Sequence, residues 1–259
     1  MTDYLLLPGM AVFLFGSCIG SFLNVCIYRI PENISIVFPG SSCPNCKTAI
    51  PFYLNIPILS YLFLKGKCRF CNHEISARYP FIEALTGIFA LLLFLKFGLT
   101  PALLYWFVFI AVLITISFID IDHQIIPDII SLPGIIIFAS SFCFLPEMTI
   151  KDTILGILIG GGSLYAVAFL YYLIKKQEGM GGGDIKLLAM IGAATGMKGV
   201  IFTIFTGSLL GTIFGILLMV YTKIKDTKLK IPFGPFLSAG AILYVFYGKE
   251  LIQWYLGSF

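Results

Sequence analysis

Long apolar segments recur along almost the whole chain, and they restrict its fold more than any other feature. With 59% hydrophobic and only 12% charged residues, the chain exceeds what a soluble core can hide. The sequence therefore predicts an all-α polytopic membrane protein with about eight transmembrane helices. The segments expected to cross the membrane are residues 5–28, 80–97, 101–119, 129–145, 153–174, 185–197, 200–221 and 231–247.

The positive charges predict how these helices are oriented. If the amino terminus lies outside, all but four of the 17 lysine and arginine residues fall in segments on the cytoplasmic side. The exceptions are Lys96, Lys151, Lys198 and Lys249. Such an excess is the positive-inside bias of membrane proteins. We therefore expect both termini outside and the ends of the first, third and fifth segments in the cytoplasm.

One polar insert interrupts the apolar segments and sets the domain division. Residues 29–79 contain five prolines, which exclude a long helix, and they read as a small cytoplasmic domain. We expect three parts: a first transmembrane helix (residues 1–28), this insert (29–79), and a membrane-embedded domain (80–259).

The insert carries two C-x₂-C pairs, Cys43 with Cys46 and Cys68 with Cys71, separated by 21 residues. This spacing is close to that of a four-thiolate structural zinc site. Two disulfides are the alternative, which a reducing cytoplasm disfavours. We predict a zinc-ribbon-like domain whose metal contributes to folding, because about fifty residues bury too little core to fold well alone.

Two aspartates stand out among only 13 acidic residues because they lie where apolar segments meet water. Asp120 follows the third apolar segment, and Asp184 follows a glycine run. An acid pair can hydrolyse a peptide bond: one ionised carboxylate activates water while the other, protonated, polarises the carbonyl. The orientation above places both aspartates at the cytoplasmic face.

The glycines before Asp184 have a possible role of their own. Gly181, Gly182 and Gly183 would permit positive φ angles and let a substrate backbone approach the acid. A structural alternative is that Asp184 is the N-cap of a helix beginning at Ile185. Both roles could coexist.

Other polar residues near the two acids leave alternatives open. Asp122 is the closest rival of Asp120, and two residues apart on a helix they cannot face the same partner. Asp128 reads as part of the first turn of the fourth helix. Glu83 could tune the site, bind substrate, or pair with Arg78.

Strings along nearly the whole chain resemble the type IV prepilin peptidases, bacterial enzymes that process pilins and type II secretion pseudopilins. They are Gly20–Val25, Tyr28-Arg29, both cysteine pairs, Asn55–Pro57, Tyr79-Pro80 with Glu83, Asp120–Asp128, Gly179–Leu187 and Pro232–Phe236. They occur in the order typical of the family, which makes the resemblance specific.

The resemblance implies a reaction and its residues. Asp120 and Asp184 match the two catalytic aspartates of the family, a match that favours Asp120 over Asp122. Members cut prepilins at the cytoplasmic face of the bacterial inner membrane, after a glycine that follows a short basic leader. Full-length members also methylate the new amino-terminal residue, usually Phe, with S-adenosylmethionine. The sequence does not reveal the methyl-donor site.

Three other functions would also use some of these features. A transporter could use the aspartates as a proton relay, but it would not need the cysteine array. A peptidase without methylation would keep the acid pair alone. A scaffold or nucleic-acid module could use the basic residues Lys65, Lys67 and Arg69, although a solvated zinc domain explains them as well. We expect prepilin or pseudopilin substrates and membrane lipid as partners, and no nucleic acid.

Overall fold

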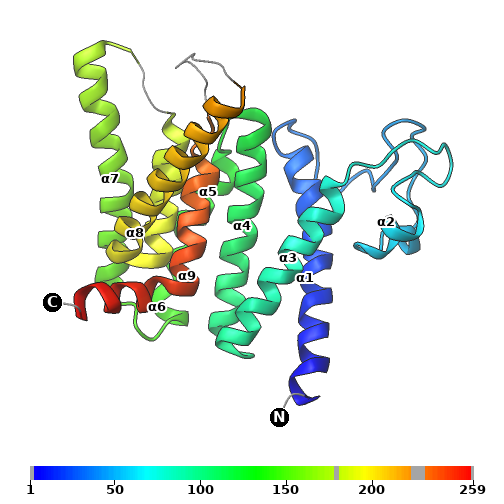
Figure 1. Ribbon diagram of the computed structural model, residues 1–259, viewed down its shortest axis with the longest axis horizontal. Helices are drawn as coiled ribbons and strands as arrows, with labels where there is room; N and C mark the ends of the chain where they lie inside the picture. Colours follow the sequence, from blue (N-terminus) through cyan, green and yellow to red (C-terminus); the bar gives the residue numbers. More distant parts are fainter. Residues whose placement is uncertain (1–2, 178–180, 223–230, 258–259) are drawn as a thin grey trace. The chain divides into compact units, whose positions relative to one another are not determined.

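The computed structural model describes residues 3–177, 181–222 and 231–257 (Figure 1). These ranges contain helices and two isolated β-bridges but no strand, as the all-α prediction requires. Gly179, Met180 and the basic segment 223–230 lie outside the described residues. The elements are α1 (Asp3–Arg29), η1 (Phe52–Leu54), α2 (Leu59–Phe63), α3 (Arg78–Phe97), α4 (Pro101–His123), α5 (Asp128–Phe138), α6 (Ser141–Phe144), α7 (Ile150–Lys175), α8 (Gly182–Thr222) and α9 (Gly234–Gly257).

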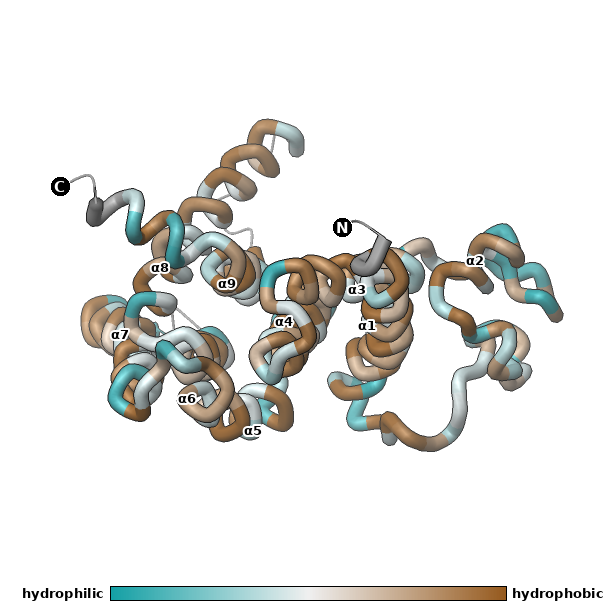
Figure 2. Tube along the Cα trace, turned by 90° about the horizontal axis from the view of Figure 1, so that it is seen from below, coloured by the Kyte–Doolittle hydropathy of each residue, from teal (hydrophilic) through white to brown (hydrophobic). Residues whose placement is uncertain are grey.

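Five helices within the described residues are long and apolar enough to cross a membrane. They comprise Leu6–Arg29, Arg78–Phe97, Pro101–His123, Ile150–Lys175 and Gly182–Thr222. Figure 2 shows hydrophobic colouring along most of α1 and α7, whereas hydrophilic residues gather near α2 in the insert. A multi-pass membrane protein is confirmed by these helices, and the count of eight spans stays a prediction.

One of the expected spans differs from the structure, and two others run together. Residues 129–145 form two short helices, α5 and α6, where the Ser140 hydroxyl donates to the Ile137 carbonyl at 2.6 Å and competes with continued helix. The spans expected at residues 185–197 and 200–221 both lie in α8, which has a kink at Gly196 (φ 69°, ψ −176°), close to the expected boundary between them. Only glycine adopts this conformation readily, so Gly196 joins two apolar helices without a loop.

Contacts divide the chain into two compact units, residues 1–111 and 112–259. In the first unit α1 packs against α3. A Cβ on Gly16 would lie 2.6 Å from Ala90 Cβ, and a Cβ on Gly20 would lie 2.8 Å from Glu83 Cα. The two glycines therefore let the helix backbones approach closely. The three-part division at residues 28 and 79 stays a prediction.

In the second unit α8 packs against α5, α7 and α9. Gly156 of α7 and Gly192 of α8 face each other so closely that a Cβ on either would collide with the carbonyl of the other. Gly207 of α8 similarly meets the first turn of α9, where its Cβ would lie 3.1 Å from the Phe236 carbonyl oxygen. These glycines therefore let α7 and α9 approach α8 closely.

Candidate active site

Asp120 lies in the last turn of α4, and its side chain is only 5% exposed. The helix ends just beyond it, at Gln124, whose φ is 54° and whose N–H donates to the Asp120 carbonyl at 2.9 Å. A carboxylate at a helix C-terminus is unfavourable, because that end of the helix dipole is negative. The backbone N–H of Gly234 offsets this cost by donating to Asp120 Oδ2 at 3.0 Å.

Asp184 lies in the first turn of α8 and is partly buried. The helix begins at Gly182, two residues before the expected boundary at Asp184 and Ile185. The prediction that Asp184 is the N-cap is therefore wrong, because Gly182 and Gly183 already have helical conformations. The negative charge of Asp184 is still favourable there, since the first turn is the positive end of the helix dipole.

Ile126 brings the two acids into one site. A Cβ on Gly183, the residue before Asp184, would lie 2.9 Å from Ile126 Cβ. A Cβ on Gly234 would lie 3.4 Å from Ile126 Cδ1 and 2.7 Å from Asp120 Oδ2. The carboxylates of Asp120 and Asp184 are also close enough for their charges to repel. The C-terminal end of α4 and the first turns of α8 and α9 therefore lie close to Ile126.

The three described glycines before Asp184 differ in their surroundings. None of Gly181, Gly182 and Gly183 has a positive φ, so the prediction that they supply this conformation is wrong for them. A Cβ on Gly181 or Gly182 would meet nothing within 4 Å, which leaves open space beside the first turn of α8. Gly183 instead has no room for a side chain, because Ile126 fills that space.

The neighbouring polar residues are on the surface. Asp122 and His123 are exposed, in contrast to the buried Asp120. Asp128 lies in the first turn of α5, as the sequence predicts, and accepts two hydrogen bonds from Lys186 Nζ at 2.6 and 2.8 Å. This ion pair ties α5 to α8 two residues after Asp184. Neither charge of the pair is buried.

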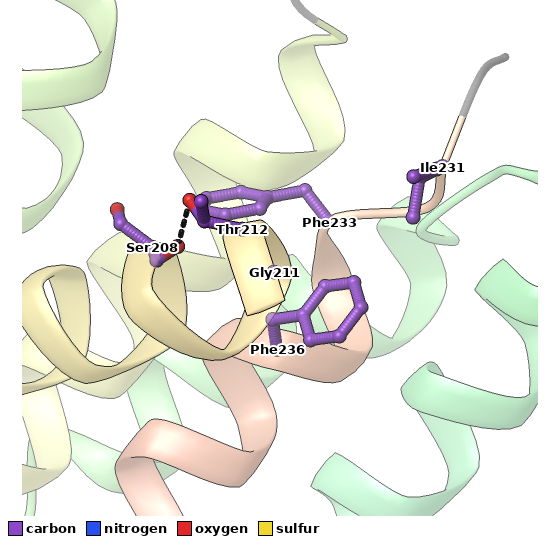
Figure 3. A pocket seen from close by; sticks show the side chains of 6 residues that line it. All are labelled: Ser208, Gly211, Thr212, Ile231, Phe233 and Phe236. Atoms are coloured by element: carbon purple, nitrogen blue, oxygen red, sulfur yellow. Dashed lines mark hydrogen bonds between the residues drawn. The ribbon is translucent and has the colours of Figure 1, made fainter. Parts of the chain in front are cut away.

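A groove of about 340 Å³ borders the turn that contains Gly234. It is lined by Ser208, Gly211, Thr212, Ile231, Phe233 and Phe236 (Figure 3). The Thr212 hydroxyl donates to the Ser208 carbonyl at 2.7 Å, so this hydroxyl is directed back onto its own helix. Ile231, Phe233 and Phe236 supply the apolar part of its walls, and Ser208 and Thr212 supply the polar part.

Sequence reasoning missed three contributors to this site: Ile126, Lys186 and Gly234. Gly234 lies in the string Pro232–Phe233–Gly234–Pro235–Phe236, which the sequence marks as part of the family resemblance without a role for the glycine. Ile126 and Lys186 likewise lie in the resembling strings Asp120–Asp128 and Gly179–Leu187 without a role of their own, since their importance comes from contacts between distant helices.

The insert places its four cysteines together. The Sγ atoms of Cys43, Cys46, Cys68 and Cys71 all lie within 4.8 Å of one another, and all four cysteines are free. The Cys43 and Cys71 Sγ atoms are 3.8 Å apart. Two thiolates on one tetrahedral zinc ion would be separated by about 3.8 Å, given a Zn–S bond of roughly 2.3 Å. The donor set and its spacing therefore fit a metal ion.

Each cysteine pair lies in a similar backbone turn. The Cys43 N–H donates to the Thr48 carbonyl at 3.0 Å, and the Cys68 N–H donates to the His73 carbonyl at 2.8 Å. The residue after each pair has a positive φ, 57° at Lys47 and 56° at Asn72. The two turns therefore present their sulfurs in the same way.

The surroundings of two cysteines favour the thiolate form that binds metals. Hydrogen bonds from the Thr48 side chain and then from the Thr48 amide lower the pKa of Cys46 to about 6. The backbone amides of Phe70 and Cys71 lower the pKa of Cys68 below its ordinary value. Since only the thiolate is a metal ligand, both effects prepare the cluster for a cation.

Glu83 anchors the insert within the first unit. Its side chain is 8% exposed, and Oε2 accepts a hydrogen bond from the Ile58 N–H at 2.7 Å. The Ser21 side chain also hydrogen-bonds to it. Ile58 has φ 62° and ψ −52°, and the Leu59 N–H reaches back to the Pro57 carbonyl at 2.5 Å. This is a strained turn for a β-branched residue.

Two family models match the chain. "Bacterial Peptidase A24 N-terminal domain" matches residues 14–97, and "Type IV leader peptidase family" matches residues 107–216. The first match contains the cysteine cluster, and the second contains both Asp120 and Asp184. No solved structure matches the chain at a significant level.

Several curated relatives are similar over almost their full length, and each is named prepilin leader peptidase/N-methyltransferase. The protein from Aeromonas salmonicida is 35% identical over 282 residues, which cover 95% of this chain and 93% of that protein. The one from Legionella pneumophila is 33% identical over 272 residues, covering 96% and 94%. The one from Pseudomonas aeruginosa is 33% identical over 275 residues, covering 95% and 93%.

Proposed function

The chain belongs to the type IV leader peptidase family, and from this membership we propose that Asp120 and Asp184 are the acid pair that cleaves prepilins. The protein is a multi-pass enzyme of the bacterial inner membrane. It removes the leader peptide from type IV prepilins or pseudopilins and N-methylates the new amino-terminal residue.

One observation carries the assignment of the acid pair. Asp120 is a buried carboxylate on α4, and Ile126 links it to Gly183 and Asp184 at the start of α8. A carboxylate inside an apolar helix is costly and is typical of a functional site. Two such groups in one place are difficult to explain by packing, since neither is needed to join α4 to α8.

In the proposed reaction, the ionised carboxylate takes a proton from a water molecule, whose oxygen attacks the carbonyl carbon of the glycine before the scissile bond. The protonated carboxyl polarises the carbonyl oxygen and then gives its proton to the leaving amine as the C–N bond breaks. The acid pair holds one proton again afterwards, so no covalent intermediate is needed. Two close carboxylates suit this division, because they do not readily ionise together.

The open space at Gly181 and Gly182 gives the substrate a route to the acids. A Cβ on either glycine would meet nothing within 4 Å, so an extended peptide can approach the first turn of α8. A prepilin has an apolar helix after its leader. Such a helix would stay in the lipid while the leader lies at the boundary where α4 ends and α8 begins.

The metal in the insert is proposed to be zinc, held by Cys43, Cys46, Cys68 and Cys71. Four thiolates in a tetrahedral set are typical of structural zinc, which would join the two cysteine turns and stabilise a domain with little core of its own. S-adenosylmethionine is the proposed methyl donor. The charge bias favours a cytoplasmic active site with both termini outside.

Cleavage of a purified prepilin in lipid nanodiscs tests the acid pair. Asp120→Asn and Asp184→Asn should each lower kcat for leader removal by at least about a thousandfold, as expected when a general acid or base is lost. Asp122→Asn is the matched control, since this exposed aspartate lies in the same turn of α4 and should retain wild-type kcat. Cleavage at the wild-type rate by either of the first two variants refutes the assignment.

A further inference from the structure

The first residue of α9, Gly234, makes a buried contact with a proposed catalytic acid. Its N–H donates to Asp120 Oδ2 at 3.0 Å, across 114 residues of sequence. Gly234 lies beyond residue 216, where the match to the family model ends. The contact therefore assigns this glycine a role that the family match does not supply.

The space around Gly234 explains why a glycine is needed. Its φ is not in the left-handed region, so other residues could adopt its backbone conformation. A Cβ there, however, would lie 2.7 Å from Asp120 Oδ2 and 3.3 Å from Asp120 Cγ. Real Cβ atoms essentially never come this close to another heavy atom. The absence of a side chain is what lets the Gly234 N–H reach the carboxylate.

The turn that carries this N–H is fixed against α8. The Phe236 ring lies 5.5 Å from the Phe214 ring, measured between centroids. Cβ atoms on Gly207 and Gly211 would lie 3.1 Å from the Phe236 carbonyl and 3.5 Å from its ring. Figure 3 shows Phe233 and Phe236 around the same part of α8. The donor is therefore held by packing.

This hydrogen bond makes the two oxygens of Asp120 different. A backbone N–H can only donate, so Oδ2 is held as its acceptor, and a proton on Asp120 is favoured on Oδ1 because a protonated oxygen is the weaker acceptor. Oδ1 is then the oxygen that we expect to meet water or substrate. We propose that Gly234 is a positioning residue for peptide cleavage that orients Asp120 so that Oδ1 takes part in the reaction. The proposal rests on the proposed catalytic role of Asp120.

Gly234→Ala tests the need for space. The added methyl group would displace the Asp120 carboxylate, and a misplacement of about 1 Å can cost roughly a hundredfold in rate. We expect kcat for prepilin cleavage to fall by about a hundredfold, with KM within about threefold of wild type, because the substrate does not bind through Gly234.

Gly207→Ala is the matched control for a general loosening of α9. Its Cβ would press on the Phe236 carbonyl at 3.1 Å, in the same helix pair, without approaching Asp120. This variant should lower the melting temperature as Gly234→Ala does, yet keep kcat within about threefold of wild type. An equal loss of kcat in both variants would overturn the proposal, since the loss would then come from helix packing.

A backbone change tests the hydrogen bond itself. Glycolic acid in place of Gly234 replaces the amide with an ester, which removes the N–H without adding atoms. We expect kcat to fall by about tenfold or more, the usual effect of losing a hydrogen bond to a charged group. An ester variant with wild-type kcat would overturn the proposal.

Comparing Asp120→Asn with Gly234→Ala distinguishes a wrong role for Gly234 from a wrong acid pair. If Asp120→Asn is inactive while Gly234→Ala cleaves at the wild-type rate, the acid pair stands and the role of Gly234 is refuted. If Asp120→Asn itself cleaves normally, the proposed function fails first.

Discussion

Ile126 occupies the space that a side chain on Gly183 would need, with its Cβ 2.9 Å from the position of that missing atom. The contact joins the loop after α4 to the first turn of α8. The glycine before Asp184 thus serves the packing of the two acids, whereas Gly181 and Gly182 leave open space.

Gly183→Ala should therefore impair leader cleavage, because its methyl group would push Ile126 or the first turn of α8 away. We expect kcat to fall by roughly tenfold to a hundredfold. Ile126→Ala in the same chain should restore part of this loss by making room. Gly162→Ala, on α7 with nothing within 4 Å of its Cβ, is the control and should match wild type. A double variant no faster than Gly183→Ala would contradict the proposed contact.

The ion pair between Asp128 and Lys186 should contribute little to stability, because both side chains are partly exposed, by 58% and 36%. Lys186→Gln is expected to lower the free energy of unfolding by less than about 1 kcal/mol. The double variant Asp128→Lys with Lys186→Asp, which exchanges the two charges, should restore the wild-type free energy of unfolding. The measurement is thermal unfolding in detergent, and a loss well above this range would show a larger structural role.

Metal removal should separate the two activities. Cys43→Ser combined with Cys68→Ser is expected to abolish bound zinc, measured by elemental analysis, and to abolish methylation. Prepilin cleavage should stay within about threefold of wild type, because the acid pair lies in the other compact unit. Ser41→Ala, close to the first pair, is the control. Full methylation by zinc-free protein would refute a role for the metal in that activity.

The stability of the turn at Ile58 should depend on the hydrogen bond that its N–H donates to Glu83. Glu83→Ala removes the acceptor of the Ile58 N–H and is expected to destabilise the insert by about 1 kcal/mol, since a partly buried N–H loses its partner. Ile58→Gly in the Glu83→Ala chain should recover part of this, because glycine adopts a positive φ without strain. Hydrogen exchange of residues 55–63 measures both effects. Equal hydrogen-exchange rates in Glu83→Ala and in the double variant would contradict backbone strain at Ile58.

Asp120 and Asp184 stand out in the sequence because a carboxylate beside an apolar segment is costly wherever the chain folds. The preference for Asp120 over Asp122 came only from the family resemblance. The cysteine cluster could be identified because its ligands are close in sequence. The start of α8 at Gly182 was not predicted, since a glycine run gives no helix signal until Ile126 packs against it. The break between α5 and α6 was missed for a similar reason: hydropathy measures how apolar a segment is, and not where a helix bends.

The role proposed for Gly234 could not be predicted from the sequence either. A single glycine at a helix start has many explanations, and only the 3.0 Å contact with Asp120 distinguishes among them. Contacts between residues more than a hundred positions apart are set by helix packing, which the local pattern does not contain.

The most direct test of the acid pair compares prepilin cleavage by Asp120→Asn, Asp184→Asn and the double variant in the same nanodiscs, with released leader measured by mass spectrometry. If the two carboxyls share one proton and act as a unit, each single variant loses nearly all activity and the double variant loses no more. Losses that multiply in the double variant would show that the two residues act independently and would contradict the account.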